Sequence, residues 1–299
     1  MVINTQGLSF TFGKQQVVKS LELQVPEGSI YGFLGPNGAG KTTTIKLLLN
    51  LLKPDAGDIF VFGQDIKSQR ISILSQIGSL IEQPAIYQHL TGKENLLNRA
   101  LLLGVPAQRV DDMLALVHLS SAADKKAGQY SLGMKQRLGI ALAMLADPKL
   151  LILDEPTNGL DPNGIIEIRE LLKKLVAEHG KTVFISSHLL SEIERMATHV
   201  GIINGGAMLF QGSIADLQAI SKPLVRIETE NTVDAANLLT RHNYQLAQVT
   251  DHDLFVPYIS KQQMGEINAL LNKNGLAVYS IGKQQKDLEK LFLDITQNA

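Results

Sequence analysis

The sequence predicts an α/β protein with a mostly parallel sheet, a helical subdomain inserted in this core, and a small α+β domain at the C-terminus. Over the first 215 or so residues, short apolar segments alternate with helical patterns. Two of these segments, Leu150–Leu153 and Thr182–Ser186, are nearly all apolar, as parallel strands covered on both faces should be. The region from about Glu82 to Asp147 is richer in helical patterns, and the texture changes again after about residue 220.

Length and composition narrow the classes of function. A chain of 299 residues is long enough for one large domain and a smaller one. Its 28 basic and 29 acidic residues give no hint of a basic face, so nucleic acid is not expected as a partner. The lack of cysteine excludes disulfides and thiolate metal sites. No secretory signal is expected, and apolar runs such as Leu138–Ala146 are shorter than the roughly 18–20 residues that span a bilayer.

Residues 1–220 are expected to form the large domain. Its clearest helix begins where Asp161 can cap it and Pro162 fits the first turn, and Gly180 can end it. Aliphatic residues recur at helical spacing between these limits, at Ile165, Ile168, Leu171, Leu172, Leu175 and Val176. The other expected elements are a strand at Ser29–Leu34 and helices at Thr42–Leu52, Gly92–Leu103, Ala107–Leu116 and Lys135–Leu145, the last three within a helical subdomain at about 82–147.

Residues 221–299 are expected to form the small domain. Their order of elements, βαββαβα, is typical of a compact α+β unit. The segments are a strand at Leu224–Glu230, a helix at Val233–Arg241, strands near Leu246 and at Leu254–Tyr258, a helix at Gln262–Asn272, a strand at Ala277–Ile281 and a helix at Lys286–Ile295. No pattern here indicates chemistry. A packing or dimer-contact role is the simplest interpretation, with regulation and ligand binding as alternatives.

A glycine-rich loop between an apolar strand and a helix is the strongest motif. Residues 35–42, GPNGAGKT, match the P-loop pattern G-x-x-x-x-G-K-[ST], and the flanking elements argue against a chance turn. Glycines let main-chain N–H groups point inward, and the helix N-terminus adds about half a positive charge. Lys41 can bind the β- and γ-phosphates, and Thr42 can offer its hydroxyl to Mg²⁺. The residues expected to bind nucleotide are Gly35, Pro36, Asn37, Gly38, Ala39, Gly40, Lys41, Thr42 and Thr43.

Two acidic residues follow another apolar strand. Asp154 stands at the carboxyl end of Leu150–Leu153, where open α/β sheets place their ligands, and it can hold Mg²⁺ directly or through water. Glu155 comes next and points elsewhere because of the strand pleat, so it can orient or deprotonate an attacking water. Such a pair alone is commonly a strand end that meets solvent. Combined with the phosphate loop, it predicts a hydrolytic site for ATP with Mg²⁺.

In their order along the chain, these motifs resemble those of ABC ATPases. The resemblance covers about residues 1–215 and rests on Gly35–Thr42, Tyr130–Arg137, Leu150–Glu155, Asn158–Asp161 and His188. The segment YSLGMKQR at Tyr130–Arg137 resembles the family signature, usually written LSGGQ. The resemblance implies a P-loop NTPase core and an ATPase that powers movement across a membrane.

The resemblance also implies roles for single residues. Ser131 and Gly133 would contact the γ-phosphate of ATP held by another subunit. His188 would help to hold the γ-phosphate and the water, although a histidine here can instead cap the next helix. Asp161 would link the two sites across a dimer, or serve only as a helix cap. Phe12 would stack on adenine, with a place in the core as the alternative.

Two departures from the family pattern narrow the resemblance. Leu132 stands where the signature usually has glycine, and Met134 where it usually has glutamine, so a side chain could limit approach of the backbone to phosphate. The family normally has a glutamine that senses Mg²⁺ at the position of Glu82, and here Gln83 follows it. Either side chain is a candidate for that Mg²⁺-sensing role. Both departures resemble the branch of bacitracin and lantibiotic export and self-protection systems.

The resemblance implies two partners. One chain carries one phosphate loop and one signature, so a second copy would complete two sites, with a helix that starts near Lys135 pointing its positive end across the interface. A separate membrane permease would dock near Glu82–Leu96, which places the chain in the cytoplasm on the inner face of the membrane. The alternatives are a soluble ABC ATPase of DNA repair or translation, and a regulatory module that binds ATP without transport.

Overall fold

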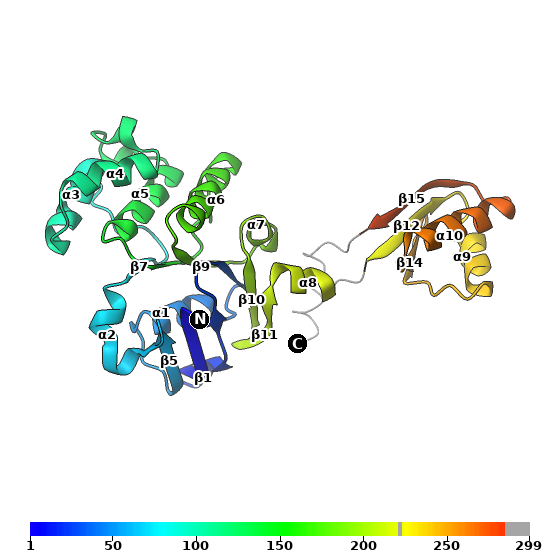
Figure 1. The fold of residues 1–299 in the computed structure, drawn as a ribbon, viewed down its shortest axis with the longest axis horizontal. Coiled ribbons are helices and arrows are strands. Elements are labelled where there is room, and N and C mark those ends of the chain that lie inside the picture. Colours follow the sequence, from blue (N-terminus) through cyan, green and yellow to red (C-terminus); the bar gives the residue numbers. More distant parts are fainter. Residues whose placement is uncertain (221–222, 285–299) are drawn as a thin grey trace. The chain divides into compact units, whose positions relative to one another are not determined.

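The computed structural model describes residues 1–220 and 223–284 (Figure 1). The chain divides into two compact units, of which the first spans Met1–Ile214 and the second begins at Ala215. The domain boundary expected after residue 220 stays a prediction. No helix within the described residues is long and apolar enough to cross a bilayer.

The central sheet of the first unit has six strands in the order β11-β10-β4-β9-β8-β7. All neighbours pair in parallel except β10 and β11. Every residue of β4, β8 and β9 is buried, which explains the apolar run of each strand, although β9 also contains Thr182, Ser186 and Ser187. The expected parallel α/β core is confirmed. The strands are β4 (Ile30–Leu34), β7 (Ile77–Leu80), β8 (Leu150–Leu153), β9 (Thr182–Ser187), β10 (His199–Asn204) and β11 (Ala207–Ser213).

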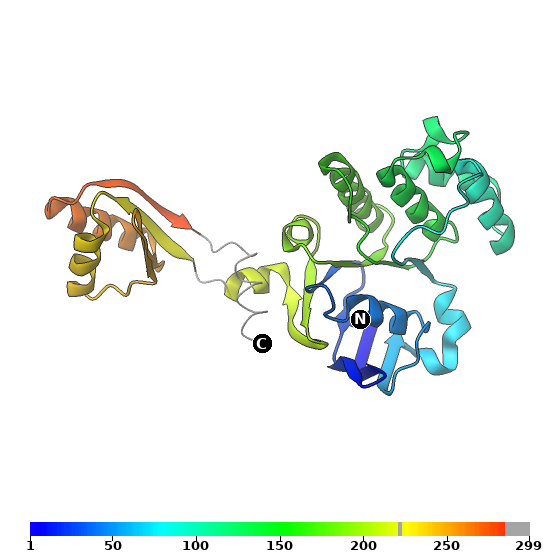
Figure 2. The ribbon, with the colours of Figure 1, turned by 180° about the vertical axis from the view of Figure 1, so that it is seen from behind.

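A second, antiparallel sheet was not anticipated from the sequence. Its strand order is β2-β1-β5-β6, and β3 pairs with β1. Apolar residues from this sheet, from α1 and from the central sheet form one core cluster. Helix α1 (Lys41–Leu48) lies between the two sheets (Figures 1 and 2). The strands are β1 (Ile3–Phe12), β2 (Gln15–Leu21), β3 (Gln24–Val25), β5 (Ala56–Val61) and β6 (Gln64–Asp65).

The helices between residues 92 and 194 lie on the opposite side of the central sheet (Figures 1 and 2). As expected, Asp161 caps α6, because its side chain accepts a hydrogen bond from the Gly164 N–H group. Helix α5 begins at Leu132 rather than near Lys135, so that start was predicted three residues too late. The cause is Ser131, whose hydroxyl accepts the Met134 N–H and makes it the N-cap. These helices are α3 (Gly92–Leu103), α4 (Gln108–Leu116), α5 (Leu132–Met144), α6 (Pro162–Ala177) and α7 (Leu190–Glu194). Helix α2 (Ile66–Leu74) packs instead against β5, β6 and β7, and α8 (Ile214–Ile220) follows β11 in the sequence.

The C-terminal unit carries a four-stranded antiparallel sheet in the order β13-β14-β12-β15. This order and the element sequence βαββαβ define a split βαβ fold. Buried residues from its sheet and helices form a core of their own. The expected final helix, Lys286–Ile295, lies outside the described residues. The elements are β12 (Leu224–Thr229), α9 (Thr232–Arg241), β13 (Gln248–Val249), β14 (Asp253–Pro257), α10 (Lys261–Lys273) and β15 (Val278–Gln284).

Asp147 ties the helical subdomain to the central sheet. One oxygen of its carboxylate lies 2.7 Å from an Arg109 guanidinium nitrogen on α4 and 3.0 Å from the Lys181 ammonium, just before β9. Burial raises the pKa of Asp147, but Lys181 and Arg109 outweigh this effect and hold its pKa below the ordinary value. The ion pairs therefore stabilise the fold above the ordinary pKa, and this contribution disappears as pH falls through the depressed value.

We predict that Asp147→Asn lowers the free energy of unfolding at pH 7 by about 0.5–1 kcal/mol, because the carboxylate is largely exposed and its ion pairs are screened. Asparagine tolerates the left-handed backbone at this position, where φ is 56°. Urea denaturation at several pH values would measure the difference, which should shrink as pH falls through the depressed pKa of Asp147. Asp55→Asn, at an exposed aspartate of the same unit, is the control. A difference that persists at low pH would contradict the electrostatic explanation.

Candidate active site

The loop between β4 and α1 has the conformation that its glycines predict. Gly38 and Gly40 have φ values of 82° and 106°, in the region that favours glycine. A Cβ atom on Gly35 would lie 2.4 Å from the Ile203 carbonyl oxygen, so no side chain fits there. Gly40 is the N-cap of α1 and offers no side-chain acceptor to the first turn. The main-chain N–H groups at this helix end suit an anion such as phosphate.

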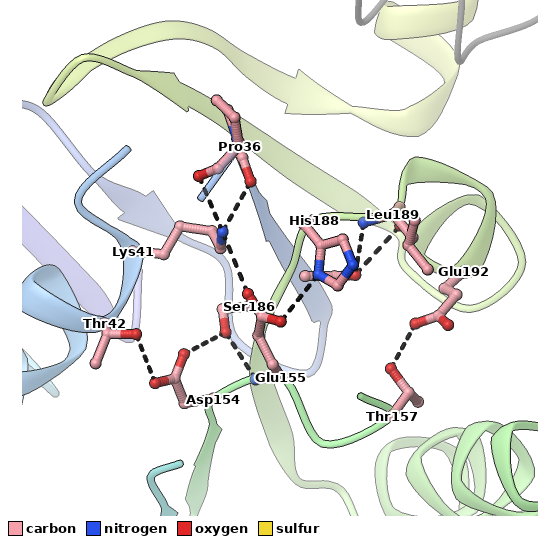
Figure 3. Close-up of polar contacts among 12 residues, drawn as sticks. Pro36, Lys41, Thr42, Asp154, Glu155, Thr157, Ser186, His188, Leu189 and Glu192 are labelled. Atoms are coloured by element: carbon pink, nitrogen blue, oxygen red, sulfur yellow. Dashed lines mark hydrogen bonds and ion pairs between the residues drawn. The ribbon is translucent and has the colours of Figure 1, made fainter. Parts of the chain in front are cut away.

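Lys41 lies at the centre of this loop, with its side chain folded inward. It is 6% exposed, and its ammonium group donates to the carbonyls of Gly35 at 2.8 Å and Pro36 at 3.2 Å. The same nitrogen lies 3.3 Å from a carboxylate oxygen of Glu155 (Figure 3). A buried cation requires such partners. The loop therefore presents a positive charge that can bind phosphate once one of these contacts is exchanged.

Asp154 is buried and held by two hydroxyl groups. Thr42 donates to one carboxylate oxygen at 2.8 Å, and Ser186 donates to the other at 2.6 Å. Ser186 also accepts the main-chain N–H of Glu155 at 2.8 Å. Within the described residues, no group of three His, Cys, Asp or Glu could hold a metal alone. A hydroxyl beside a carboxylate nevertheless suits Mg²⁺, which commonly takes one or two protein oxygens and completes its shell with phosphate and water.

Glu155 lies between Lys41 and His188. One of its carboxylate oxygens faces Lys41, and the other accepts the Nδ1–H of His188 at 2.9 Å (Figure 3). The backbone of Glu155 has φ 45°, an uncommon conformation that is often found at functional sites. His188 does not cap the following helix, because Leu189 is the N-cap of α7 and provides no side-chain hydrogen bond. The interpretation of His188 as a helix cap is therefore wrong.

A cavity of about 480 Å³ opens beside these carboxylates. Glu82 and Gln83 both line it, together with Thr42, Asp154 and Glu155. The Glu82 carboxylate is exposed and accepts the Lys46 ammonium at 2.9 Å. Which of the two takes the Mg²⁺-sensing role stays a prediction.

Three other candidates lie on separate elements. Phe12, at the end of β1, is 52% exposed and packs edge-to-face on Phe10 at 4.7 Å between ring centroids, so its interpretation as a core residue is wrong. Ser131 and Gly133 stand at the N-terminus of α5. Within the described residues, no hydrogen bond or ion pair joins these three to Lys41 or the carboxylates. Their roles in nucleotide binding stay predictions.

Sequence reasoning missed contacts that hold the two strand-end loops together. Ser186 bridges Asp154 and the Glu155 backbone, as described above. Thr157 donates a hydrogen bond to the Glu192 carboxylate on α7 (Figure 3). Ser186 could have been found, because polar residues at the carboxyl end of a parallel strand belong to the ligand edge of the sheet.

Comparisons with known proteins agree with this geometry. The family model described as ABC transporter matches residues 18–158. The bacitracin transport ATP-binding protein BcrA of Bacillus licheniformis is 42% identical, over 98% of this chain and 97% of that protein. The lantibiotic transport ATP-binding protein SrtF of Streptococcus pyogenes is 40% identical, over 70% of this chain and 90% of that protein.

The chain belongs to the ABC transporter family. A solved ATP-binding subunit of an ABC transporter has a TM-score of 0.65 and 29% identity, over 74% of this chain and 93% of that one. The resemblance read from the motifs is thereby confirmed, including its branch, and so is the P-loop NTPase core. This ABC transporter subunit is an ATPase that binds ATP. Because the match to BcrA covers 98% of the chain, it includes the C-terminal unit.

We predict that Ser186→Ala lowers kcat for ATP hydrolysis by about ten- to a hundredfold, because the Asp154 carboxylate and the main-chain N–H of Glu155 both lose the hydroxyl that orients them. The unpaired Asp154 oxygen should also lower the free energy of unfolding by about 1–3 kcal/mol. Steady-state kinetics and urea denaturation measure the two effects. Ser75→Ala, which removes an exposed hydroxyl bonded only to the Ser72 carbonyl, is the matched control. An unchanged kcat would remove Ser186 from the site.

Proposed function

We propose that this chain is the Mg²⁺-dependent ATP-hydrolysing subunit of a transporter for peptide antibiotics of the bacitracin or lantibiotic class, acting in export or self-protection. The observation that carries the proposal is the run of contacts from Thr42 and Lys41 through Asp154 and Glu155 to His188. The names of BcrA and SrtF support the substrate class.

The phosphate loop and its neighbours bind the nucleotide. The N–H groups at the start of α1 and the Lys41 ammonium hold the phosphates, and the exposed ring of Phe12 stacks on adenine. Thr42 and Asp154 supply the oxygens that hold Mg²⁺, whose chemistry is to neutralise charge on the phosphate oxygens. The Thr42 hydroxyl donates a hydrogen bond to the Asp154 carboxylate, so the two groups already lie side by side.

Glu155 is the general base, and His188 positions it. Lys41 must leave the Glu155 carboxylate to reach a phosphate, and this exchange frees an oxygen that can accept a proton from water. The Nδ1–H of His188 holds the other oxygen and so fixes the direction of the carboxylate. When the ring carries both protons, as an imidazolium, its Nε2–H can donate to the γ-phosphate. Glu155 therefore changes from the counter-ion of Lys41 into the base.

Two copies of the chain complete the site. Ser131, Gly133 and the N–H groups at the start of α5 cap the nucleotide held by the second copy, because they stand at a helix N-terminus and do not join the chain's own Lys41. Asp161 links the two sites while it caps α6. A two-fold pair uses the same surface on each copy. The pair docks under a separate permease on the inner face of the membrane, in the cytoplasm.

We predict that Glu155→Gln retains ATP binding and loses hydrolysis by roughly 10²–10⁴-fold. The amide keeps the shape of the side chain but cannot accept the proton from water. Fluorescence titration with a nucleotide analogue measures binding, and phosphate release measures turnover. Glu178→Gln, at an exposed glutamate near the end of α6, is the control and should match the wild type. Unchanged turnover in Glu155→Gln would remove this residue from the mechanism.

The transport proposal is tested in a bacterium that is sensitive to bacitracin and to a lantibiotic. The chain and the permease encoded beside it should together raise the tolerated antibiotic concentration, and Glu155→Gln should abolish the gain. ATPase activity of the purified complex should rise when the permease is present. No change in tolerance to either antibiotic would contradict the proposed substrate class. Stimulation of ATP hydrolysis by DNA or ribosomes, in place of the permease, would contradict the transport function itself.

A further inference from the structure

Leu132 is an exposed leucine at a position where the backbone is expected to come close to phosphate. It is the first residue of α5, directly after the N-cap Ser131, and its side chain is 45% exposed. A leucine there was expected to hinder contact between the backbone and phosphate. Its neighbours give it a different role.

Two leucine–glycine pairs lock the start of α5 to the loop 158–161. A Cβ atom on Gly159 would lie 3.2 Å from Leu132 Cδ2, so Leu132 covers Gly159. In the reverse direction, a Cβ atom on Gly133 would lie 3.8 Å from Leu160 Cδ2. Each segment thus places a leucine over a glycine of the other. Gly159 has φ 74°, a conformation that excludes most side chains, so the space for Leu132 is built into the loop.

The same loop is joined to the hydrolytic residue. The N–H of Asn158 donates to the Glu155 carbonyl at 3.1 Å, and the N–H of Leu160 donates to the Thr157 carbonyl at 3.2 Å. These turns make the loop follow the backbone of Glu155. Asp161 then starts α6, so the loop has little freedom at either end. A shift at Glu155 is therefore carried to Gly159 and Leu160.

We propose that Leu132 is a positioning residue that couples the chain's own phosphate site to the segment that caps the nucleotide of a second copy. The inference rests on the proposed function, in which Ser131 and Gly133 act on the partner's nucleotide. When Lys41 releases Glu155, the loop 158–161 moves, and the Leu132–Gly159 contact moves the start of α5 with it. Nucleotide in one site thereby prepares the other, which is positive cooperativity.

The ion pair between α5 and α6 does not replace this contact. Arg137 lies 3.4 Å from Glu167, in the next turns of both helices, and one of its partners is half exposed. Such a pair holds the helices together but does not reach the loop. The coupling therefore depends on the two leucine–glycine pairs, of which Leu132 on Gly159 is the tighter one.

The test compares Leu132→Ala with Leu132→Met in the full chain. Alanine removes the contact with Gly159, and methionine conserves most of the volume. The wild type and Leu132→Met should hydrolyse ATP with a Hill coefficient clearly above 1, and Leu132→Ala with one of about 1. Amide hydrogen exchange in the free protein should become about tenfold faster at Asn158 and Leu160 in Leu132→Ala only. Leu101→Ala, at an exposed leucine of α3, is the matched control.

The outcomes separate the inference from the proposed function. A cooperative wild type with an equally cooperative Leu132→Ala overturns the inference and leaves the dimer intact. A changed melting temperature of Leu132→Ala, with its Hill coefficient and amide exchange rates unchanged, shows that Leu132 only fills space. This outcome also overturns the inference. A wild type that hydrolyses ATP without cooperativity and stays monomeric contradicts the proposed pair of sites. The proposed coupling is then contradicted as well.

Discussion

The parallel pairing of β4, β9 and β8 is the constraint on which the site depends. Leu34 pairs with Ser187, and Leu153 pairs with Ile185, so all three strands end at the same edge of the sheet. Ser186, near the end of β9, therefore meets Asp154, which follows β8, and the Gly35 N–H meets the Ser187 carbonyl, although these residues lie far apart in the sequence. A slip of one residue in any pair would turn these side chains to the other face. The hydrogen bonds of Ser186 with the Asp154 carboxylate and the Glu155 N–H hold β8 and β9 in this register.

Charge balance explains how a buried lysine is accommodated at this edge of the sheet. Lys41 is nearly fully buried, and an unpaired ammonium there would be costly. Glu155 and two carbonyl groups of the loop compensate it. The same carboxylate also binds His188, so three charged or polar groups from three segments restrain one another. Binding of a phosphate gives Lys41 a new anionic partner, while Glu155 keeps its contact with His188.

Local signals in the sequence were sufficient for the phosphate loop and the strand-end carboxylates, because each motif contains both the chemistry and the element that presents it. Contacts between distant segments were less predictable. Nothing near Ser186 in the sequence shows that Asp154 lies on the neighbouring strand. The start of α5 was misplaced because Ser131 was taken for a ligand contact only, whereas a serine before a helix is also a strong cap.

The antiparallel sheet was missed for a different reason. Burial along β1 alternates over much of Ile3–Phe12, as a strand with one buried face requires, but the residues INTQGLSFTF mix polar and apolar types too evenly to stand out. Pairing of β1 with β5, some fifty residues later, decides the outcome. The exposed end of β1 leaves Phe12 outside the core, which no local pattern foretells.

The hydrophobic centre of the C-terminal unit is built from its own residues, from β12 to β15. A part that folds around its own interior can be gained or lost by gene fusion and deletion without damage to the rest. The match to BcrA spans nearly the whole chain, whereas the match to SrtF spans 210 residues, 70% of this chain, and still fills 90% of that protein. The unit can therefore change, or be absent, without disturbing the interior of the domain that hydrolyses ATP.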